Sequence, residues 1–396
     1  MFSDHPVFVV LAVAVVAPLL AEIPIGVRVP IAVLEVLLGA LVGPHVLGLI
    51  RPDLFLSTTE RLGVCAMLFI AGMEIDFEQI RGRPLSLALR GWGVSVALAF
   101  AAVSLLHLIP GISAPMMVAI ALTTTGLGTL MPILRDGGHL ATSFGRHVLA
   151  AGTVGEVGPV VAASLILSTR YSSWQEFGFL IVFLTLVAAA AAAGIAARPS
   201  KLIKLLSRTL NSSTQLPIRL ALLLMVGLAV LADEFGFEGI FGAFAAGLVV
   251  GLATRGEAGE PFRVKIDAIC FGWFMPFFFI GTGLQWDLGV LTLDVASMLL
   301  MPTFLVLFLL VRGLPVLLYR SDLSKPQQSP FVLFGSVASL GLVVVITQVG
   351  LSAKAMSPAV AHALIAAALM SLLLYPTLAG ALLSRIAPPS SQSASG

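Results

Sequence analysis

Residues 148–167 read VLAAGTVGEVGPVVAASLIL, and nearly every one of them is apolar. An apolar run of this length, as a helix, crosses the ~30 Å hydrocarbon core of a bilayer. One carboxylate, Glu156, interrupts the run near its middle. Ionisable side chains at membrane depth are costly and are functional by default, although a neutral, hydrogen-bonded glutamate in a helix bundle is the alternative. The stretch therefore predicts a membrane helix that carries a working acid.

The rest of the chain has the same character. Of its 396 residues 58% are hydrophobic and 11% are charged, whereas soluble domains average roughly 45–50% and about 25%. We therefore expect an all-α polytopic membrane protein. The amino terminus lacks the basic region and cleavage site of a signal peptide, so we expect the first apolar run to stay as a membrane helix.

Several function classes are disfavoured by what the sequence lacks. The two cysteines, Cys65 and Cys270, lie in apolar stretches, and the six histidines show no pair at metal-ligand spacing. There is no nucleophile–base motif and no glycine-rich phosphate loop. We therefore expect neither an enzyme nor a cofactor, no metal beyond a transported cation, and no nucleic acid as a partner.

Thirteen apolar runs are long enough to be membrane spans. We expect one transmembrane domain over residues 1–386, with repeat one at 7–168, a linker helix at 177–197, repeat two at 216–384, and a polar tail at 387–396. The predicted spans are 7–22, 29–50, 62–75, 86–109, 114–134, 145–168, 177–197, 216–233, 236–254, 266–284, 293–318, 330–350 and 358–384.

The basic residues test that number of spans. Thirteen spans assign 18 of the 22 Lys and Arg residues, Arg312 among them, to one face of the membrane and four to the other. Cytoplasmic loops carry the excess of positive charge. The expected topology in the cell (inner) membrane is therefore an outside amino terminus and a cytoplasmic carboxyl terminus.

Two spans contain helix-breaking clusters. In the fifth, ALTTTGLGTLMPIL, Thr123, Thr124 and Thr125 run into glycine, and in the twelfth, FGSVASLGLVVVITQVG, Ser339 and Gly341 stand among small residues. Small residues also allow close helix packing, which is the alternative reading. Because the two spans occupy matching places in the two halves, the pattern favours broken helices of an inverted-repeat transporter.

Glu156 has oxygen-bearing neighbours. It lies about 16 Å along a helix from Gly145, near the bilayer midplane. Thr153 is one turn earlier on the same face. Pro159 cannot donate to the carbonyl of Gly155, so we expect that oxygen to lack a partner. A carboxylate, a hydroxyl and a carbonyl suit an alkali cation.

A second membrane acid is Glu35, six residues into its span in VPIAVLEVLLGALVGP. The sequence leaves open whether it is a gate, an acid of an entry funnel or a packing residue.

Five segments give the chain a wider resemblance. They are LEVLLGALVGPHVLGL (34–49), LGVCAMLFIAGMEIDF (62–77), ALTTTGLGTLMPIL (121–134), GIFGAFAAGLVVG (239–251) and MPFFFIGTGLQWDLGVL (275–291). Together they resemble the bacterial monovalent cation/proton antiporters of the sodium/hydrogen-exchanger superfamily, closest to the Kef-type and related branch.

The resemblance implies a homodimer of thirteen-helix subunits, each with a dimerisation domain and a core domain in which two broken helices cross beside the ion site. The family's ion-site acid falls on Glu156, its polar broken-helix motif falls on Thr123, Thr124 and Thr125, and Glu35 looks like a family feature.

The chain also departs from its relatives. Gly155 precedes the acid where the ion-pumping branch has a second acid. The tenth span, 266–284, lacks the Lys or Arg of some relatives, with Phe271 near its place, and Gly341 stands near a glutamate often found in the twelfth span. Kef-type relatives continue into a nucleotide-binding domain, which we do not expect here.

These observations predict a secondary transporter that exchanges Na⁺ or K⁺ for H⁺ by alternating access, with one acid binding either ion. Two alternatives stay open: a ligand-gated, channel-like cation efflux protein, and a carrier for an organic or anionic solute.

Overall fold

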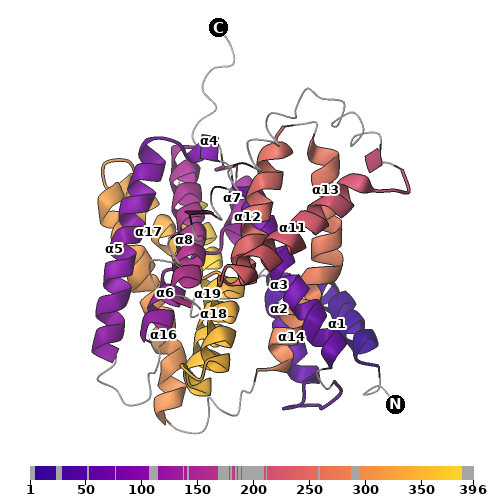
Figure 1. Ribbon diagram of the computed structural model, residues 1–396. Helices are drawn as coiled ribbons and strands as arrows, with labels where there is room; N and C mark the ends of the chain where they lie inside the picture. Colours follow the sequence, from indigo (N-terminus) through magenta and orange to yellow (C-terminus); the bar gives the residue numbers. More distant parts are fainter. Residues whose placement is uncertain are drawn as a thin grey trace. The chain divides into compact units, whose positions relative to one another are not determined.

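The computed structural model describes most of the chain, and Figure 1 labels its helices. The predicted polar tail lies outside the described residues, as does nearly all of the predicted linker helix 177–197. The described residues are 5–23, 29–50, 53–75, 77–106, 115–136, 138–140, 142–167, 178, 181–182, 185, 189, 209–210, 212–256, 259–286 and 295–385.

Regular secondary structure in these ranges is helical throughout. Seven helices in the described residues are long and apolar enough to cross a membrane, and shorter apolar helices accompany them. The predicted all-α polytopic class is confirmed, whereas the count of thirteen spans stays a prediction. The seven are Leu54–Glu74, Arg83–Leu105, Leu216–Glu234, Glu260–Leu284, Met298–Tyr319, Lys325–Ser352 and Pro358–Leu383.

Two predicted boundaries were wrong. Helix α2 (Ile31–Val42) ends before residue 50, where Gly48, at φ +63°, closes a turn. Helix α3 (Leu54–Glu74) begins eight residues earlier than its predicted span of 62–75, at a cap in which the Asp53 carboxylate accepts the N–H of Leu56 at 2.7 Å. Hydroxyls in its first turns donate back to helix carbonyls, which hides polar side chains inside an apolar segment.

The chain divides into two compact units, and each combines segments from both halves of the sequence. Unit 1 comprises residues 1–23, 31–76 and 160–287, and unit 2 comprises 24–30, 77–159 and 288–396. The dividing point after Pro159 falls inside α8 (Ser143–Leu167). The predicted division into two repeats and a linker helix stays a prediction.

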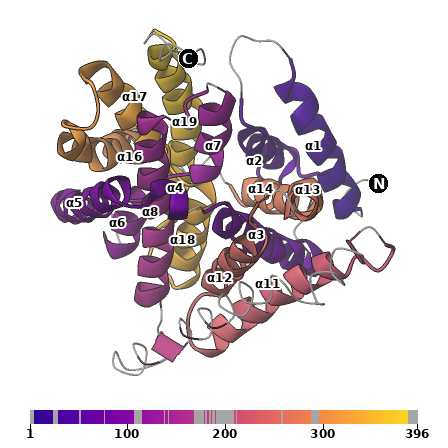
Figure 2. The ribbon, with the colours of Figure 1, turned by 90° about the horizontal axis from the view of Figure 1, so that it is seen from above.

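Unit 1 holds α1 (Pro6–Ala21), α2, α3, α11 (Leu216–Glu234), α12 (Gly239–Ala253), α13 (Glu260–Ile269), the π-helix η2 (Cys270–Phe274) and α14 (Met275–Leu284). Helix α12 packs against α3 and α11, as Figure 2 shows. A Cβ on Gly247 would collide with the Phe69 carbonyl, so glycine lets α12 and α3 approach closely.

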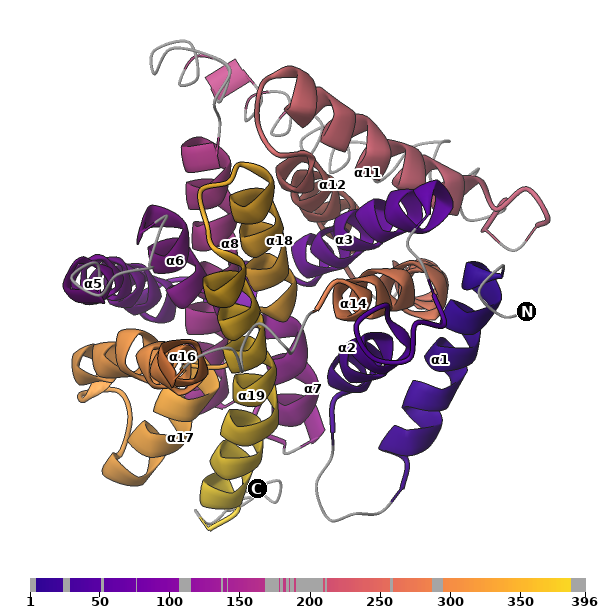
Figure 3. The ribbon, with the colours of Figure 1, turned by 90° about the horizontal axis from the view of Figure 1, so that it is seen from below.

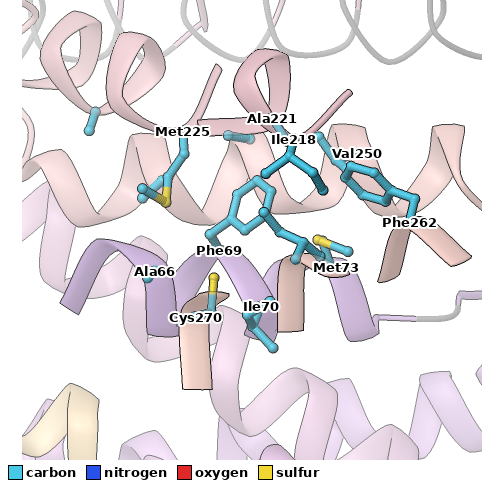
Figure 4. Close-up of a cluster of buried hydrophobic side chains, with 14 of the residues drawn as sticks. Ala66, Phe69, Ile70, Met73, Ile218, Ala221, Met225, Val250, Phe262 and Cys270 are labelled. Atoms are coloured by element: carbon cyan, nitrogen blue, oxygen red, sulfur yellow. The ribbon is translucent and has the colours of Figure 1, made fainter. Parts of the chain in front are cut away.

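A buried hydrophobic cluster joins these helices of unit 1 (Figure 4). Phe69 and Met73 of α3 meet Ile218 and Met225 of α11, with Val250 of α12 beside them. Large apolar side chains in contact give most of the burial energy, about 1.5–3 kcal/mol each. The cluster explains why segments nearly 150 residues apart in sequence form one unit.

Unit 2 holds α4 (Phe77–Ile80), α5 (Arg83–Leu106), α6 (Pro115–Leu122), α7 (Leu127–Asp136), α8 as far as Pro159, α16 (Val295–Gly313), the 3₁₀-helix η3 (Leu314–Tyr319), α17 (Lys325–Gly335), α18 (Leu340–Ser352) and α19 (Pro358–Leu383). Helix α19 packs against α16, α17 and α18, as Figure 3 shows. Unit 2 therefore contains both of the spans that carry helix-breaking clusters.

Candidate functional site

Both predicted interruptions are present. Helix α6 ends at Leu122 and α7 begins at Leu127, while α17 ends at Gly335 and α18 begins at Leu340. The hydroxyls of Thr123 and Thr124 donate to the carbonyls of Ile120 and Ala121, each at 2.8 Å. These bonds satisfy carbonyls that the end of the helix leaves without N–H partners. The threonine run therefore acts as a helix terminator.

The two breaks cross each other. The N–H of Gly126 donates to the carbonyl of Val337 at 2.8 Å, and the hydroxyl of Thr125 donates to the carbonyl of Gly335 at 2.7 Å. A longer bond of 3.4 Å joins the N–H of Ser339 to the Thr124 hydroxyl. A Cβ on residue 126 would come within 3.0 Å of the Ala338 carbonyl oxygen, so glycine permits this approach. The predicted crossing of broken helices is confirmed.

Helix α8 lies against the first break. The carboxylate Oε2 of Glu156 accepts the N–H of Leu127, the first residue of α7, at 3.3 Å. The side chain is buried, with 5% of its surface exposed. The start of a helix carries partial positive charge and unpaired N–H groups, so it favours a carboxylate. The acid is therefore held at a helix N-terminus inside unit 2.

The expectation that the Gly155 carbonyl lacks a partner is wrong. That oxygen accepts the N–H of Thr125 at 2.8 Å. Pro159 does leave the oxygen without its helical donor, but the unwound backbone of the crossing supplies another one. The proline therefore helps to join α8 to the broken helix.

The remaining predicted residues divide between the two units. Thr153 is buried one turn before Glu156, and Ser339 and Gly341 are buried at the start of α18, all in unit 2. Glu35 is also buried, but it lies on α2 of unit 1. The structure thus places the broken-helix residues and Glu156 in the same unit, and Glu35 in the other.

Arg312 is the residue that sequence reasoning misplaced. It was assigned to the positively charged membrane face, yet 6% of its surface is exposed. Its Nε donates to the Thr125 hydroxyl at 2.8 Å, Nη1 donates to Ser95 at 3.3 Å, and Nη2 donates to the carbonyl of Ala151 at 3.0 Å. The signal was already present in the sequence, because Arg312 lies inside the predicted span 293–318, six residues before its end.

Arg312 also brings a positive charge close to the C-terminus of α17 at the crossing. The hydroxyl that Arg312 contacts, on Thr125, donates to the carbonyl of Gly335, the last residue of α17. Helix C-termini carry partial negative charge, which a guanidinium compensates. Guanidinium groups stay protonated in proteins. A permanent positive charge is therefore part of the site.

Comparison with known proteins agrees with this architecture. Residues 11–385 match the model of the transmembrane sodium/hydrogen exchanger family. The chain belongs to this family. The family is one of exchangers and not of enzymes, so the predicted resemblance at superfamily level is confirmed; the Kef-type branch stays a prediction.

Individual relatives are distant. The YjbQ protein of Bacillus subtilis is 24% identical over 387 residues, which cover 93% of this chain and 61% of YjbQ. GerN of Bacillus cereus, a Na⁺/H⁺-K⁺ antiporter, is 25% identical over 63% of this chain and 64% of its own length. The chain thus spans less than two thirds of the length of either relative.

Among solved structures, the sodium proton antiporter MjNhaP1 of Methanocaldococcus jannaschii matches with a TM-score of 0.62 at 17% identity, over 97% of this chain and 99% of its own. The likeness establishes a shared fold.

Proposed function

We propose that this protein exchanges a monovalent cation, Na⁺ or K⁺, for H⁺, and that Glu156 binds either ion. The observation that carries the proposal is the buried carboxylate of Glu156 against the first N–H of α7, beside two crossing broken helices. Half-helix ends at a crossing are the usual construction of an ion site in secondary transporters. Membership of the exchanger family supports the same activity.

The mechanism is a competition for one carboxylate. When Glu156 is protonated it offers no charge to a cation, and when it is ionised it attracts one. Further oxygen ligands for the cation come from Thr153 and from the second lone pair of the Gly155 carbonyl. Arg312 holds a permanent positive charge in the same unit, where it donates to the carbonyl of Ala151 on α8.

The threonine hydroxyls at the crossing have different roles. The Thr125 hydroxyl both donates to Gly335 and accepts from Arg312, so it holds the crossing together. The Thr123 and Thr124 hydroxyls keep lone pairs that can face an ion. Ser339 and Gly341, at the start of α18, line the second break.

The remaining parts of the proposal concern the cycle and its setting. One acid carries one proton or one monovalent cation, so the exchange is one for one and electroneutral, by alternating access. The protein is a homodimer in the cell (inner) membrane with its amino terminus outside and its carboxyl terminus in the cytoplasm. Glu35 acts as a gate or accessory acid.

The test uses purified protein in proteoliposomes that hold a pH gradient. Na⁺, K⁺, Li⁺ and Rb⁺ are added in turn, and dissipation of the gradient is followed with a pH-sensitive dye. We expect Na⁺ or K⁺ to dissipate the gradient for the natural sequence but not for Glu156→Gln. The matched control is Glu22→Gln, an exposed glutamate at the end of α1, which keeps full activity.

The same vesicles separate the alternatives. A channel-like protein would carry cation flux without coupled proton movement, and a carrier of organic or anionic solutes would not respond to any alkali cation gradient. Full exchange by Glu156→Gln would remove Glu156 from the site.

A further inference from the structure

Every backbone N–H in the second break, residues 336–339, has an acceptor. The first two donate to carbonyls in the last turns of α17. The fourth, that of Ser339, donates to the Thr124 hydroxyl of the other break. The third, that of Ala338, donates at 3.0 Å to the hydroxyl of Ser371 on α19. A buried N–H without an acceptor is costly, so Ser371 completes the hydrogen bonding of the break.

The first break depends on α8 in the same way. Its third residue, Thr125, donates its N–H to the carbonyl of Gly155, which Pro159 leaves without a helical donor. In α19 the proline, Pro376, lies two places further from the start of its helix. There the hydroxyl of Ser371 accepts the N–H of the break instead of a backbone carbonyl. Each break is therefore joined to the helix that follows it in the chain.

Ser371 also stands at the place in α19 that Glu156 has in α8. Both residues lie thirteen positions after the first residue of their helices, which are Ser143 and Pro358. Both side chains accept a backbone N–H at a break. A glutamate can ionise and a serine cannot. Ser371 is therefore the uncharged counterpart of Glu156.

The hydroxyl of Ser371 is held in one orientation. The residue is fully buried, and the hydroxyl donates to the carbonyl of Ala368, one turn earlier in α19, at 2.7 Å. With its one hydrogen used in this way, the oxygen accepts the N–H of Ala338. A hydroxyl that both donates and accepts fixes its own rotamer and the position of the Ala338 peptide.

The Ala338 peptide connects Ser371 with the acid through the crossing. A Cβ on Gly126 would come within 3.0 Å of the Ala338 carbonyl oxygen, so the two backbones are close at this point. The residue after Gly126 is Leu127, whose N–H donates to Glu156. A shift of the second break is therefore passed to the N–H that holds Glu156.

We propose that Ser371 is a positioning residue of the cation site, and that its hydroxyl holds the second break in the geometry that cation binding at Glu156 requires. The inference rests on the proposed function. Ser371 touches neither the cation nor the proton. It acts through Ala338 and the backbone of the first break.

Loss of the hydroxyl weakens cation binding and leaves the rate of the cycle intact. Without its acceptor the Ala338 N–H is unsatisfied, and the break shifts to find another partner. A bound cation needs several oxygen ligands at fixed distances, whereas a proton on Glu156 needs one oxygen. The apparent KM for the cation therefore rises, by roughly threefold to tenfold for one lost buried hydrogen bond, while the maximum rate is kept.

The first experiment compares Ser371→Ala with Thr347→Val in proteoliposomes. Thr347 of α18 is buried as well, but its hydroxyl donates to the carbonyl of Val344 in its own helix, at 2.8 Å. We expect Ser371→Ala to raise the KM for Na⁺ or K⁺ at an unchanged maximum rate per inserted protein, and Thr347→Val to change neither. An unchanged KM in Ser371→Ala, or an equal rise in both variants, overturns the inference.

A double-mutant cycle tests the route through the crossing. Gly126→Ala pushes against the Ala338 carbonyl, and Ser371→Ala lets that peptide move away. We therefore expect the KM of the double variant to rise by less than the product of the two single effects. Gly126→Ala combined with Thr347→Val should give the product. A product in both cycles would show that Ser371 does not act through the crossing.

Hydrogen–deuterium exchange of the full chain in lipid nanodiscs needs no transport. Peptides that contain residues 336–341 report on the Ala338 amide. We expect deuterium uptake there to be faster in Ser371→Ala and unchanged in Thr347→Val. If uptake rises as expected but the natural sequence transports no alkali cation, the proposed function fails and the contact stands. If transport is intact while uptake and KM are unchanged in Ser371→Ala, the inference fails alone.

Discussion

Glu156 on α8 and Glu60 on α3 are both buried carboxylates in membrane-length helices, yet they meet different groups. Glu60, in unit 1, accepts two hydrogen bonds from the side-chain amide of Gln285, at 2.9 and 3.1 Å. Glu156, in unit 2, meets the first backbone N–H of α7 at a helix break. A side-chain amide moves with its rotamer, whereas a helix N-terminus is a fixed dipole. Burial alone therefore does not distinguish the two acids, whereas the groups that hold each carboxylate do.

The largest expected effect separates these two acids directly. Glu156→Gln abolishes cation-driven proton flux, because the amide resembles a permanently protonated site. Glu60→Gln keeps most of the flux, because an amide at residue 60 can still bond to Gln285. Proteoliposome flux normalised to inserted protein makes the comparison. Equal loss of flux in the two variants would contradict the comparison, because the acid that bonds to a backbone N–H and the acid that bonds to a side-chain amide would then be equally required.

The second largest effect is expected from the loss of the buried charge of Arg312. Arg312→Gln leaves Thr125, Ser95 and the Ala151 carbonyl without their donor inside unit 2. Hydrogen bonds to charged groups contribute about 1.5–3 kcal/mol each, so we expect a clear loss of thermal stability in detergent together with a large loss of exchange. Arg312→Lys keeps the charge but not the planar fork, and should recover part of the stability. Unchanged melting of Arg312→Gln would contradict the buried network.

A substitution that pushes the two broken helices apart should reduce cation binding less than the loss of Arg312 does. In Gly126→Ala the new methyl group would meet the Ala338 carbonyl at 3.0 Å, so the breaks must separate by a few tenths of an ångström. We expect a cost of about 1–3 kcal/mol and a severalfold rise in the KM for the cation. Gly93→Ala on α5, where nothing lies within 4 Å, is the matched control. Equal KM values for the two variants would show that the crossing is not tight.

The threonines allow a finer comparison inside the break. Thr125→Val loses both the contact with Gly335 and the contact with Arg312, whereas Thr124→Val loses a local bond and a long one to Ser339. We therefore expect Thr125→Val to lower thermal stability more than Thr124→Val does, and both to weaken cation binding. Isothermal cation titrations and melting curves of the two variants supply the measurement; the reverse order in stability would refute the assignment of Thr125 to the framework.

The smallest effect on stability lies at the surface of unit 2. The Arg83–Asp322 pair lowers the pKa of Asp322, so its contribution is present above the ordinary pKa of an aspartate and is lost as pH falls through the lowered value. Exposed pairs contribute little and are screened by salt. We expect Asp322→Asn to leave the melting temperature at neutral pH almost unchanged. A large destabilisation would mean that this pair helps to hold α5 against η3.

Much of this architecture was predictable from the sequence alone. The length of the apolar runs indicated a membrane protein and located helices that cross the bilayer. This works because backbone N–H and C=O groups inside a bilayer find hydrogen-bond partners only within a helix. The threonine run at 123–125 and the small residues around Ser339 and Gly341 predicted the two breaks, because residues that bond to their own backbone, and glycine, end helices locally. Glu156 stood out because charge is rare in such runs. The membrane topology and the linker helix remain predictions.

Tertiary structure decided how the parts meet. The count of positive charges assigned Arg312 to one face of the membrane, and only the packing of α16 against the crossing gives it Thr125, Ser95 and the carbonyl of Ala151 as acceptors. Local rules likewise left the Gly155 oxygen unpaired, but its donor is the N–H of Thr125, thirty residues away. The sequence determined which residues break helices and which side chain carries charge, because those properties are local. The partners of these groups depend on which distant backbone atoms the fold brings within hydrogen-bonding distance.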